Sequence, residues 1–134
     1  MTATDCPFCS PAIDIREEPI YFETERWRVT DNKAPYDNAK TNLLLLPKDH
    51  ITKFRWSQKT LGLWSEFYTG VMPFVQKNWP QGTLLMRLGG FETTGRSIEH
   101  LHLHWIVPKP GQTVYAHMGP RKWKSEEWQD LKKT

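Results

Sequence analysis

The sequence has no apolar run near the roughly 18 residues that a membrane-spanning helix requires. Its first five residues lack the basic and then apolar pattern of a secretory signal. Neither sign of charge is in large excess, since 18 basic and 15 acidic residues give a formal net charge of +3. We therefore expect a cytoplasmic protein that binds no membrane and shows no specific binding to nucleic acid.

Cysteine is also scarce, with only Cys6 and Cys9 in the 134 residues. In a reducing compartment, two cysteines are more often thiols or metal ligands than a structural disulfide. A redox-active Cys-x-x-Cys pair is a weaker interpretation, because no βαβ pattern of the thioredoxin type surrounds it. Spare thiols and a metal site both stay open at this point.

Large aromatic rings are plentiful, with seven Trp, six Phe and four Tyr. They can fill a real core, because a domain of about 150 residues buries close to 70% of its unfolded surface. No internal repeat, low-complexity segment or long linker divides the chain. We expect a single domain over residues 1–134.

Apolar patterning predicts short strands at 20–24, 27–30, 43–46 and 84–88. Ser57 is the expected N-cap of one long helix over 58–77, in which Pro73 should kink the helix or end its regular part. Apolar residues at three- and four-residue steps predict the buried stripe of this helix: Leu61, Trp64, Tyr68, Val71 and Val75. Hairpins, one long helix and further strands indicate an α+β fold with a mainly antiparallel sheet.

Three histidines at alternate positions are the most informative motif: His100, His102 and His104. Successive side chains of a strand point to opposite faces, so the imidazoles share one face and the intervening apolar residues share the other. A neutral imidazole is both a nucleophile and a proton carrier near neutral pH. The three histidines are therefore candidate active-site residues.

The same histidines could instead bind a metal. At about 3.3 Å per residue, His100 and His104 start roughly 13 Å apart, which is too far for both to reach one zinc easily. Two of the three could share a metal, but all three could not easily do so. The spacing therefore favours nucleophilic and acid chemistry for at least part of the row.

The stretch Gly95–His104 resembles the signature of the histidine triad (HIT) nucleotide hydrolases and transferases. Cys6–Cys9 is similar to the Cys-x-x-Cys of many bacterial members, and Leu43–His50 resembles their apolar strand that ends in Pro-Lys-x-His. The resemblance covers roughly residues 6–110 and leaves 111–134 as a C-terminal extension. It implies a HIT-like fold with a five-stranded sheet, one long helix, a shorter N-terminal helix or turn, and a homodimer.

The resemblance also implies an activity. The chain would act at the α-phosphate of a purine nucleotide conjugate, either a dinucleoside polyphosphate or a phosphoramidate, through a covalent nucleotidyl-histidine intermediate. His102 matches the nucleophile, and His104 matches the residue that donates a hydrogen bond to the phosphate or leaving group. His100 matches the first histidine of the catalytic row. No organic cofactor is implied.

Five further positions fall where members of the family have substrate contacts, although not all of them keep the usual residue. Gly89 departs from the Asn or Gln common among relatives, and Asn42 stands where many have a histidine supporting the triad. Asp31 matches the acidic residue that binds the ribose hydroxyls. The full set of expected substrate-binding residues is Asp31, Asn42, Gly89, Arg96 and Ser97.

Four residues match the zinc ligands of the zinc-containing members: Cys6, Cys9, His50 and His100. A closed set of four protein ligands is the mark of a structural zinc. Two other functions compete with the enzyme. A zinc hydrolase would need an open metal position. A nucleotide-binding sensor or interaction protein would have no need of the nucleophile.

Overall fold

The computed structural model describes residues 2–120. Strand β3 (Ala39–Pro47) organises the fold, because the residues of its second half are buried on both faces. Leu43 and Leu45 belong to a core cluster shared with the main helical segment, whereas Leu44 and Leu46 pack with the cysteine-containing N-terminal segment. The continuous apolar run of this strand is therefore covered from two sides, as expected for a central strand.

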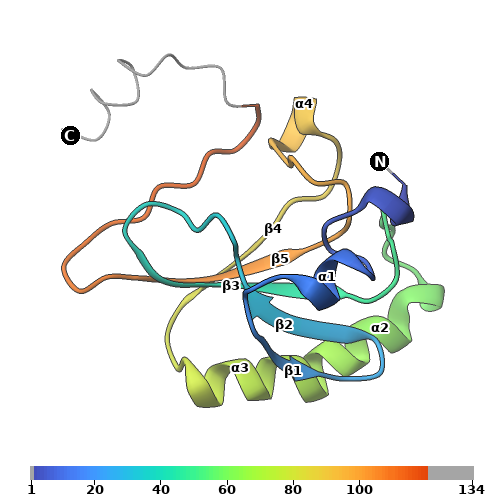
Figure 1. The fold of residues 1–134 in the computed structure, drawn as a ribbon, viewed down its shortest axis with the longest axis horizontal. Helices are drawn as coiled ribbons and strands as arrows, with labels where there is room; N and C mark the ends of the chain where they lie inside the picture. Colours follow the sequence, from blue (N-terminus) through green and yellow to red (C-terminus); the bar gives the residue numbers. More distant parts are fainter. Residues whose placement is uncertain (1, 121–134) are drawn as a thin grey trace.

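The sheet has the order β1-β2-β3-β5-β4, and all its pairings are antiparallel (Figure 1). The other strands are β1 (Ile20–Glu23), β2 (Trp27–Asp31), β4 (Thr83–Met86) and β5 (Leu103–Pro108). Two short helices are α1 (Ala12–Ile15) and α4 (Phe91–Thr94), and a 3₁₀ turn spans Ala3–Asp5. The expected α+β fold, with five strands, one main helix and a short N-terminal helix, is confirmed.

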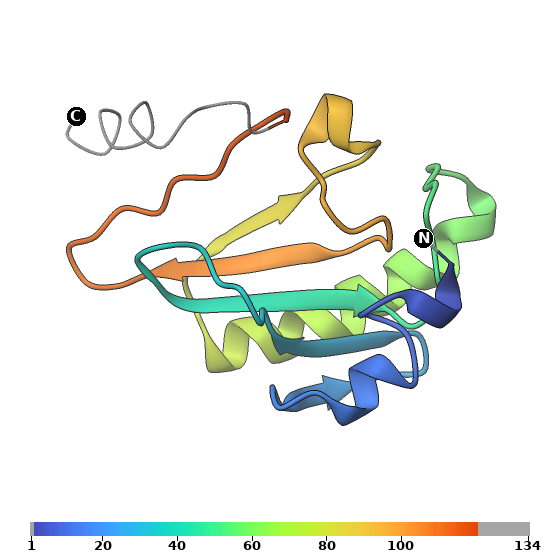
Figure 2. The ribbon, with the colours of Figure 1, turned by 45° about the horizontal axis from the view of Figure 1, so that its top comes forward.

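The main helical segment lies along one face of the sheet (Figure 2). Its parts are a 3₁₀ turn (Gln58–Thr60), α2 (Leu61–Glu66), a π turn (Phe67–Val71) and α3 (Met72–Asn78). Pro73 stands in the first turn of α3, where a backbone N–H is not needed. The regular α-helix therefore stops before Pro73 and resumes around it, as the sequence predicts.

The predicted buried stripe is wrong at two residues. Tyr68 is 79% exposed and Leu61 is 65% exposed, whereas Phe67 is buried. In the π turn the bond from Met72 N–H runs back five residues to Phe67. This wider turn brings Phe67, rather than Tyr68, onto the face of Val71.

The expected alternation of the triad strand is confirmed, although its ladder is shorter than predicted. Leu103 and Trp105 lie in the core beneath the main helical segment, and His104 is paired with Leu44 on the opposite face. Sheet pairing begins only at Leu103. Leu101 N–H instead donates to the carbonyl of Ile51 at 2.7 Å, so the chain before β5 is held by a loop.

After β5 the chain turns back over the sheet (Figure 2). Asn38 donates a side-chain hydrogen bond to the carbonyl of Thr113 at 3.1 Å. Gly95 has φ +77°, and a Cβ there would overlap the carbonyl oxygen of Gly119, so this close approach requires glycine. The expected extension 111–134 is described as far as residue 120, and its remainder lies outside the described residues. Within the described part, no helix has the length and apolarity to span a membrane.

Candidate active site and metal centre

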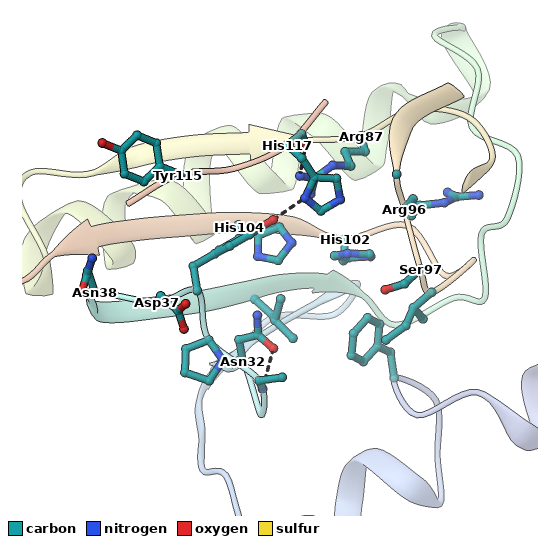
Figure 3. Close-up of a pocket in the computed structure, with 17 residues that line it drawn as sticks. Asn32, Asp37, Asn38, Arg87, Arg96, Ser97, His102, His104, Tyr115 and His117 are labelled. Carbon is teal, nitrogen blue, oxygen red and sulfur yellow. Dashed lines mark hydrogen bonds between the residues drawn. The ribbon is translucent and has the colours of Figure 1, made fainter. Parts of the chain in front are cut away.

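A cavity of about 390 Å³ lies on the sheet face away from the main helical segment (Figure 3). His102 and His104 form its floor, and Arg96 and Ser97 contribute from the segment before β5. These four expected site residues are brought together. The volume is in the range of small-molecule sites.

His102 is held in one tautomer. Its Nδ1 lies 2.8 Å from the carbonyl oxygen of His100, and because a carbonyl only accepts, Nδ1 carries the proton. Nε2 is then left with its lone pair. Burial lowers the pKa of His102 to about 4, and the nearby Arg96 adds to this effect. The ring is therefore neutral at neutral pH and has the form that a nucleophile needs.

His104 takes the opposite tautomer. The amide nitrogen of Asn42 lies 3.2 Å from His104 Nδ1. The orientation of this amide is fixed, because the backbone N–H of Tyr36 donates to Asn42 Oδ1 at 3.2 Å. The NH₂ group therefore faces the imidazole, whose Nδ1 must accept. Burial lowers the pKa of His104 to about 3, so the neutral ring carries its proton on Nε2 and can donate it.

Other expected residues lie apart from this cavity. Asp31 lines a neighbouring cavity of about 350 Å³ and accepts a hydrogen bond from Tyr21 at 2.6 Å. Asn32 lines both cavities. Asn42 lines the neighbouring cavity and supports His104 from behind. Gly89 lines neither of these two cavities.

Arg96 lines the cavity, but its guanidinium is bound outside it. Its Nη2 donates to the carbonyl of Thr52 at 3.1 Å. Figure 3 shows this side chain extending away from His102. The guanidinium that reaches the cavity beside His104 belongs instead to Arg87, which the sequence alone did not indicate.

Further lining residues were not predicted, namely Tyr36, Asp37, Asn38, Tyr115 and His117. They come from the loop before β3 and from the chain after β5. Neither segment has a periodic pattern that predicts a side chain's direction.

The four expected metal ligands converge behind the triad. Cys9 Sγ lies 3.3 Å from His100 Nδ1 and 3.4 Å from His50 Nδ1, and these two nitrogens are 3.3 Å apart. All four donor atoms, including Cys6 Sγ, lie within 4.8 Å of one another. Tetrahedral zinc separates two nitrogens by about 3.4 Å and a nitrogen from a sulfur by about 3.6 Å. The geometry therefore fits this ion.

The protonation of the cluster supports the fit. His100 Nε2 lies 2.7 Å from the carbonyl of Pro47, so Nε2 carries the proton and Nδ1 is free to bind a metal. Burial and the neighbouring Cys6 raise the pKa of the Cys9 thiol to about 11. A divalent cation would offset that effect by stabilising the thiolate. The ring of His100 faces this cluster, and only its carbonyl oxygen reaches His102.

Comparison with known proteins gives a consistent result. Residues 5–118 match the family model described as scavenger mRNA decapping enzyme C-term binding. A HIT family hydrolase from Legionella pneumophila is 21% identical, over 81% of this chain and 95% of that chain, with a TM-score of 0.63. A histidine triad protein from Clostridium difficile is 20% identical, over 87% of this chain and 99% of that chain, with a TM-score of 0.64. No curated protein matches the chain.

A zinc-bound histidine triad family protein from Mycobacterium smegmatis is 16% identical, over 97% of this chain and 91% of that chain, with a TM-score of 0.61. At these identities, the likeness to solved structures establishes a shared fold. The match to the family model covers most of the chain and establishes membership in the family.

The donor geometry predicts that purified protein contains about one zinc per chain without added metal. Cys9→Ser should lose the metal and lower the melting temperature by several degrees, because the ion would link the N-terminal segment to His50 and His100. Elemental analysis and thermal unfolding measure both effects. Ser10→Ala, at an exposed neighbour, is the control. The site would be contradicted if elemental analysis found no metal in the purified protein, or if chelation left the melting temperature unchanged.

The hydrogen bonds predict that two adjacent imidazoles are neutral at pH 7 with opposite tautomers, Nδ1–H in His102 and Nε2–H in His104. Long-range ¹H–¹⁵N NMR distinguishes the two forms. Asn42→Leu should leave His102 unchanged and convert His104 to a mixture of tautomers, because its Nδ1 loses its donor. A pure Nδ1–H form of His104 in the unmodified protein would refute the assignment.

Proposed function

The chain belongs to the histidine triad family, and from this membership we propose that it cleaves nucleotide conjugates at the α-phosphate through a nucleotidyl-histidine intermediate. One observation carries this proposal. The hydrogen bond from His102 Nδ1 to the carbonyl of His100 leaves Nε2 unprotonated in the cavity. A protein that only binds nucleotides would have no need of this nucleophile.

The proposed reaction has two displacements at phosphorus. His102 Nε2 forms a bond to the α-phosphorus, while the bond to the leaving group breaks and the leaving group takes its electron pair. The hydrogen bond from Nδ1 to His100 stabilises the positive charge that the ring gains. Water or another acceptor then attacks the phosphorus, loses a proton, and releases His102.

Two donors would stabilise the charged oxygens during these steps. His104 presents its Nε2–H, because Asn42 occupies its Nδ1. Ser97 is an exposed residue on the wall of the same cavity. Each donor aimed at developing charge typically contributes 10²- to 10³-fold to kcat. His100 acts through its carbonyl and is therefore a positioning residue.

A zinc ion would be held by four protein ligands, namely Cys6, Cys9, His50 and His100. Because four protein ligands leave no position for a reacting water, this zinc would be structural. This ligand set disfavours the alternative of a zinc hydrolase. It gives His100 a fixed orientation instead.

We assign the nucleoside to the neighbouring cavity. Asn32 and Pro35 line both cavities, so a nucleotide could place its ribose near Asp31 and its phosphate near His102. Purine preference and a homodimer stay predictions of the family resemblance. Activity against matched purine and pyrimidine conjugates tests the first, and light scattering of the purified protein tests the second.

His102→Ala should lower turnover by several orders of magnitude and leave nucleotide binding measurable, because the covalent route is lost and the cavity remains. The measurement compares hydrolysis of adenosine 5′-phosphoramidate and diadenosine triphosphate. After a rapid quench in alkaline denaturant, which preserves the acid-labile P–N bond, unmodified protein should retain radiolabel from the α-phosphate, whereas the variant should retain none. Near-normal turnover by the variant would exclude the nucleophile. Nucleotide binding without turnover by the unmodified protein would favour the non-catalytic alternative.

Asp31→Asn should weaken binding of AMP by about tenfold, as expected for the loss of a charged acceptor. It should weaken binding of 2′,3′-dideoxy-AMP less, because that ligand has no ribose hydroxyls to donate. Tyr21→Phe is the matched control, since it removes the partner of the same carboxylate and leaves the charge. Equal losses for both ligands would show that Asp31 does not contact the hydroxyls.

A further inference from the structure

Arg87 directly follows β4 and stands beside the nucleophile. The β4–β5 register pairs Leu85 with His104 and Met86 with Leu103. Continued by one step beyond the paired residues, this register would bring Arg87 across from His102. Directly opposite residues of antiparallel strands project from the same face, with Cβ atoms about 5 Å apart. The side chain of Arg87 therefore shares the face of the triad, and Figure 3 shows it beside His117, over the cavity.

The guanidinium of Arg87 is held at both ends by neutral acceptors. Nη1 donates to the hydroxyl of Tyr36 at 3.0 Å, and Nη2 donates to the carbonyl of His117 at 2.7 Å. Arg87 is only 9% exposed, and its buried Nε has no hydrogen-bond partner among residues 2–120. In the described part of the chain, Arg87 forms no ion pair with a carboxylate.

A buried cation is costly when it has no counter-ion, and no carboxylate among residues 2–120 pairs with Arg87. Within this part of the chain, a structural role is therefore a poor explanation for its burial. Two other arginines are paired with carboxylates instead. Arg16 and Arg28 pair with Glu18 and Glu23, respectively. Arg87 also influences the triad electrostatically, since its charge lowers the pKa values of both His102 and His104. A bound anion in the cavity would supply the missing negative charge.

The strand order indicates which part of a substrate would reach Arg87. In the sheet, β3 lies on one side of β5 and β4 lies on the other. The cavity assigned to the nucleoside is lined by Asp31 and Asn42, on the β2–β3 side. A nucleotide whose phosphorus lies at His102 would therefore extend its leaving group toward β4 and Arg87.

We propose that Arg87 is a specificity-determining residue that binds phosphate oxygens of the leaving group. The site then favours conjugates joined through a polyphosphate over phosphoramidates. This inference rests on the proposed function. Tyr36 and His117 hold the planar guanidinium in a fixed orientation, which suits the two-pronged recognition of phosphate.

The test compares two substrates that share an adenylyl group. Diadenosine triphosphate releases ADP, whose phosphates can reach Arg87, whereas adenosine 5′-phosphoramidate releases ammonia. Arg87→Met should lower kcat/KM by about 10- to 100-fold for the first substrate and by less than about threefold for the second. Arg87→Lys keeps the charge without the planar fork, so it should give an intermediate loss on the triphosphate.

Arg26→Met is the control, because it removes a surface cation that pairs with Glu25 and Glu66. It should change neither rate. An equal loss on both substrates with Arg87→Met, or no loss on either, would overturn the assignment of Arg87 and leave the proposed function standing. The melting temperature of each variant shows whether it is folded.

A binding measurement needs no Arg87 variant and no turnover. In His102→Ala protein, ADP should bind at least about tenfold more tightly than AMP, because only ADP has a second phosphate to reach Arg87. Equal affinities would overturn the proposal even if every Arg87 variant failed to fold. If the unmodified protein cleaves neither substrate but keeps this preference, the proposed catalysis fails and the role of Arg87 in binding phosphate stands.

Discussion

The hydrogen bond from His102 Nδ1 to the carbonyl of His100 is the interaction on which the proposed chemistry depends. It selects the tautomer, aims Nε2 at the cavity and can stabilise a positive ring. Its acceptor lies just before the paired part of β5, so the sheet alone does not fix it. The ring of His100 does so instead, through its bond to Pro47 and its place among Cys9 and His50. A cluster outside the cavity therefore orients the residue whose carbonyl sets the tautomer of His102.

Burial has two opposing effects in this site. It lowers the pKa values of His102 and His104 to about 4 and about 3, which keeps both rings neutral. Neutrality suits a nucleophile, but it removes two positive charges that could have attracted an anionic substrate. The side chain of Asn42, which supports His104, is an amide that does not titrate and that presents its N–H to the ring. The attraction for phosphate must therefore come from residues whose charge survives burial, and arginine meets that condition.

Much of the fold could be predicted from regular patterns, since alternation of His and Leu separates two faces wherever the chain is extended. The metal cluster could be predicted only through the family resemblance, which implied the four donors of the Cys-x-x-Cys, Pro-Lys-x-His and triad motifs as one ligand set. The helix phase could not be predicted in full. Tyr68 and Phe67 are both compatible with a 3.6-residue period, and the π turn before Pro73 decides between them. A helical period averaged over the whole segment does not predict where such a π turn occurs.

The direction of the Arg96 side chain, which the sequence did not predict, has a different physical cause. A motif fixes the backbone position of Arg96, but a long side chain takes its direction from the acceptors around it, and the carbonyl of Thr52 lies within reach. Arg87 has no motif, since its place on the face of the triad comes from the pairing of β4 with β5, whose facing residues lie seventeen to twenty-three positions apart in the sequence. Its second anchor, His117, comes from a segment without periodicity. Contacts of this kind exist only after the sheet has formed. The proposed substrate selection therefore rests on residues that are least visible in the sequence, whereas the proposed chemistry rests on those that are most visible.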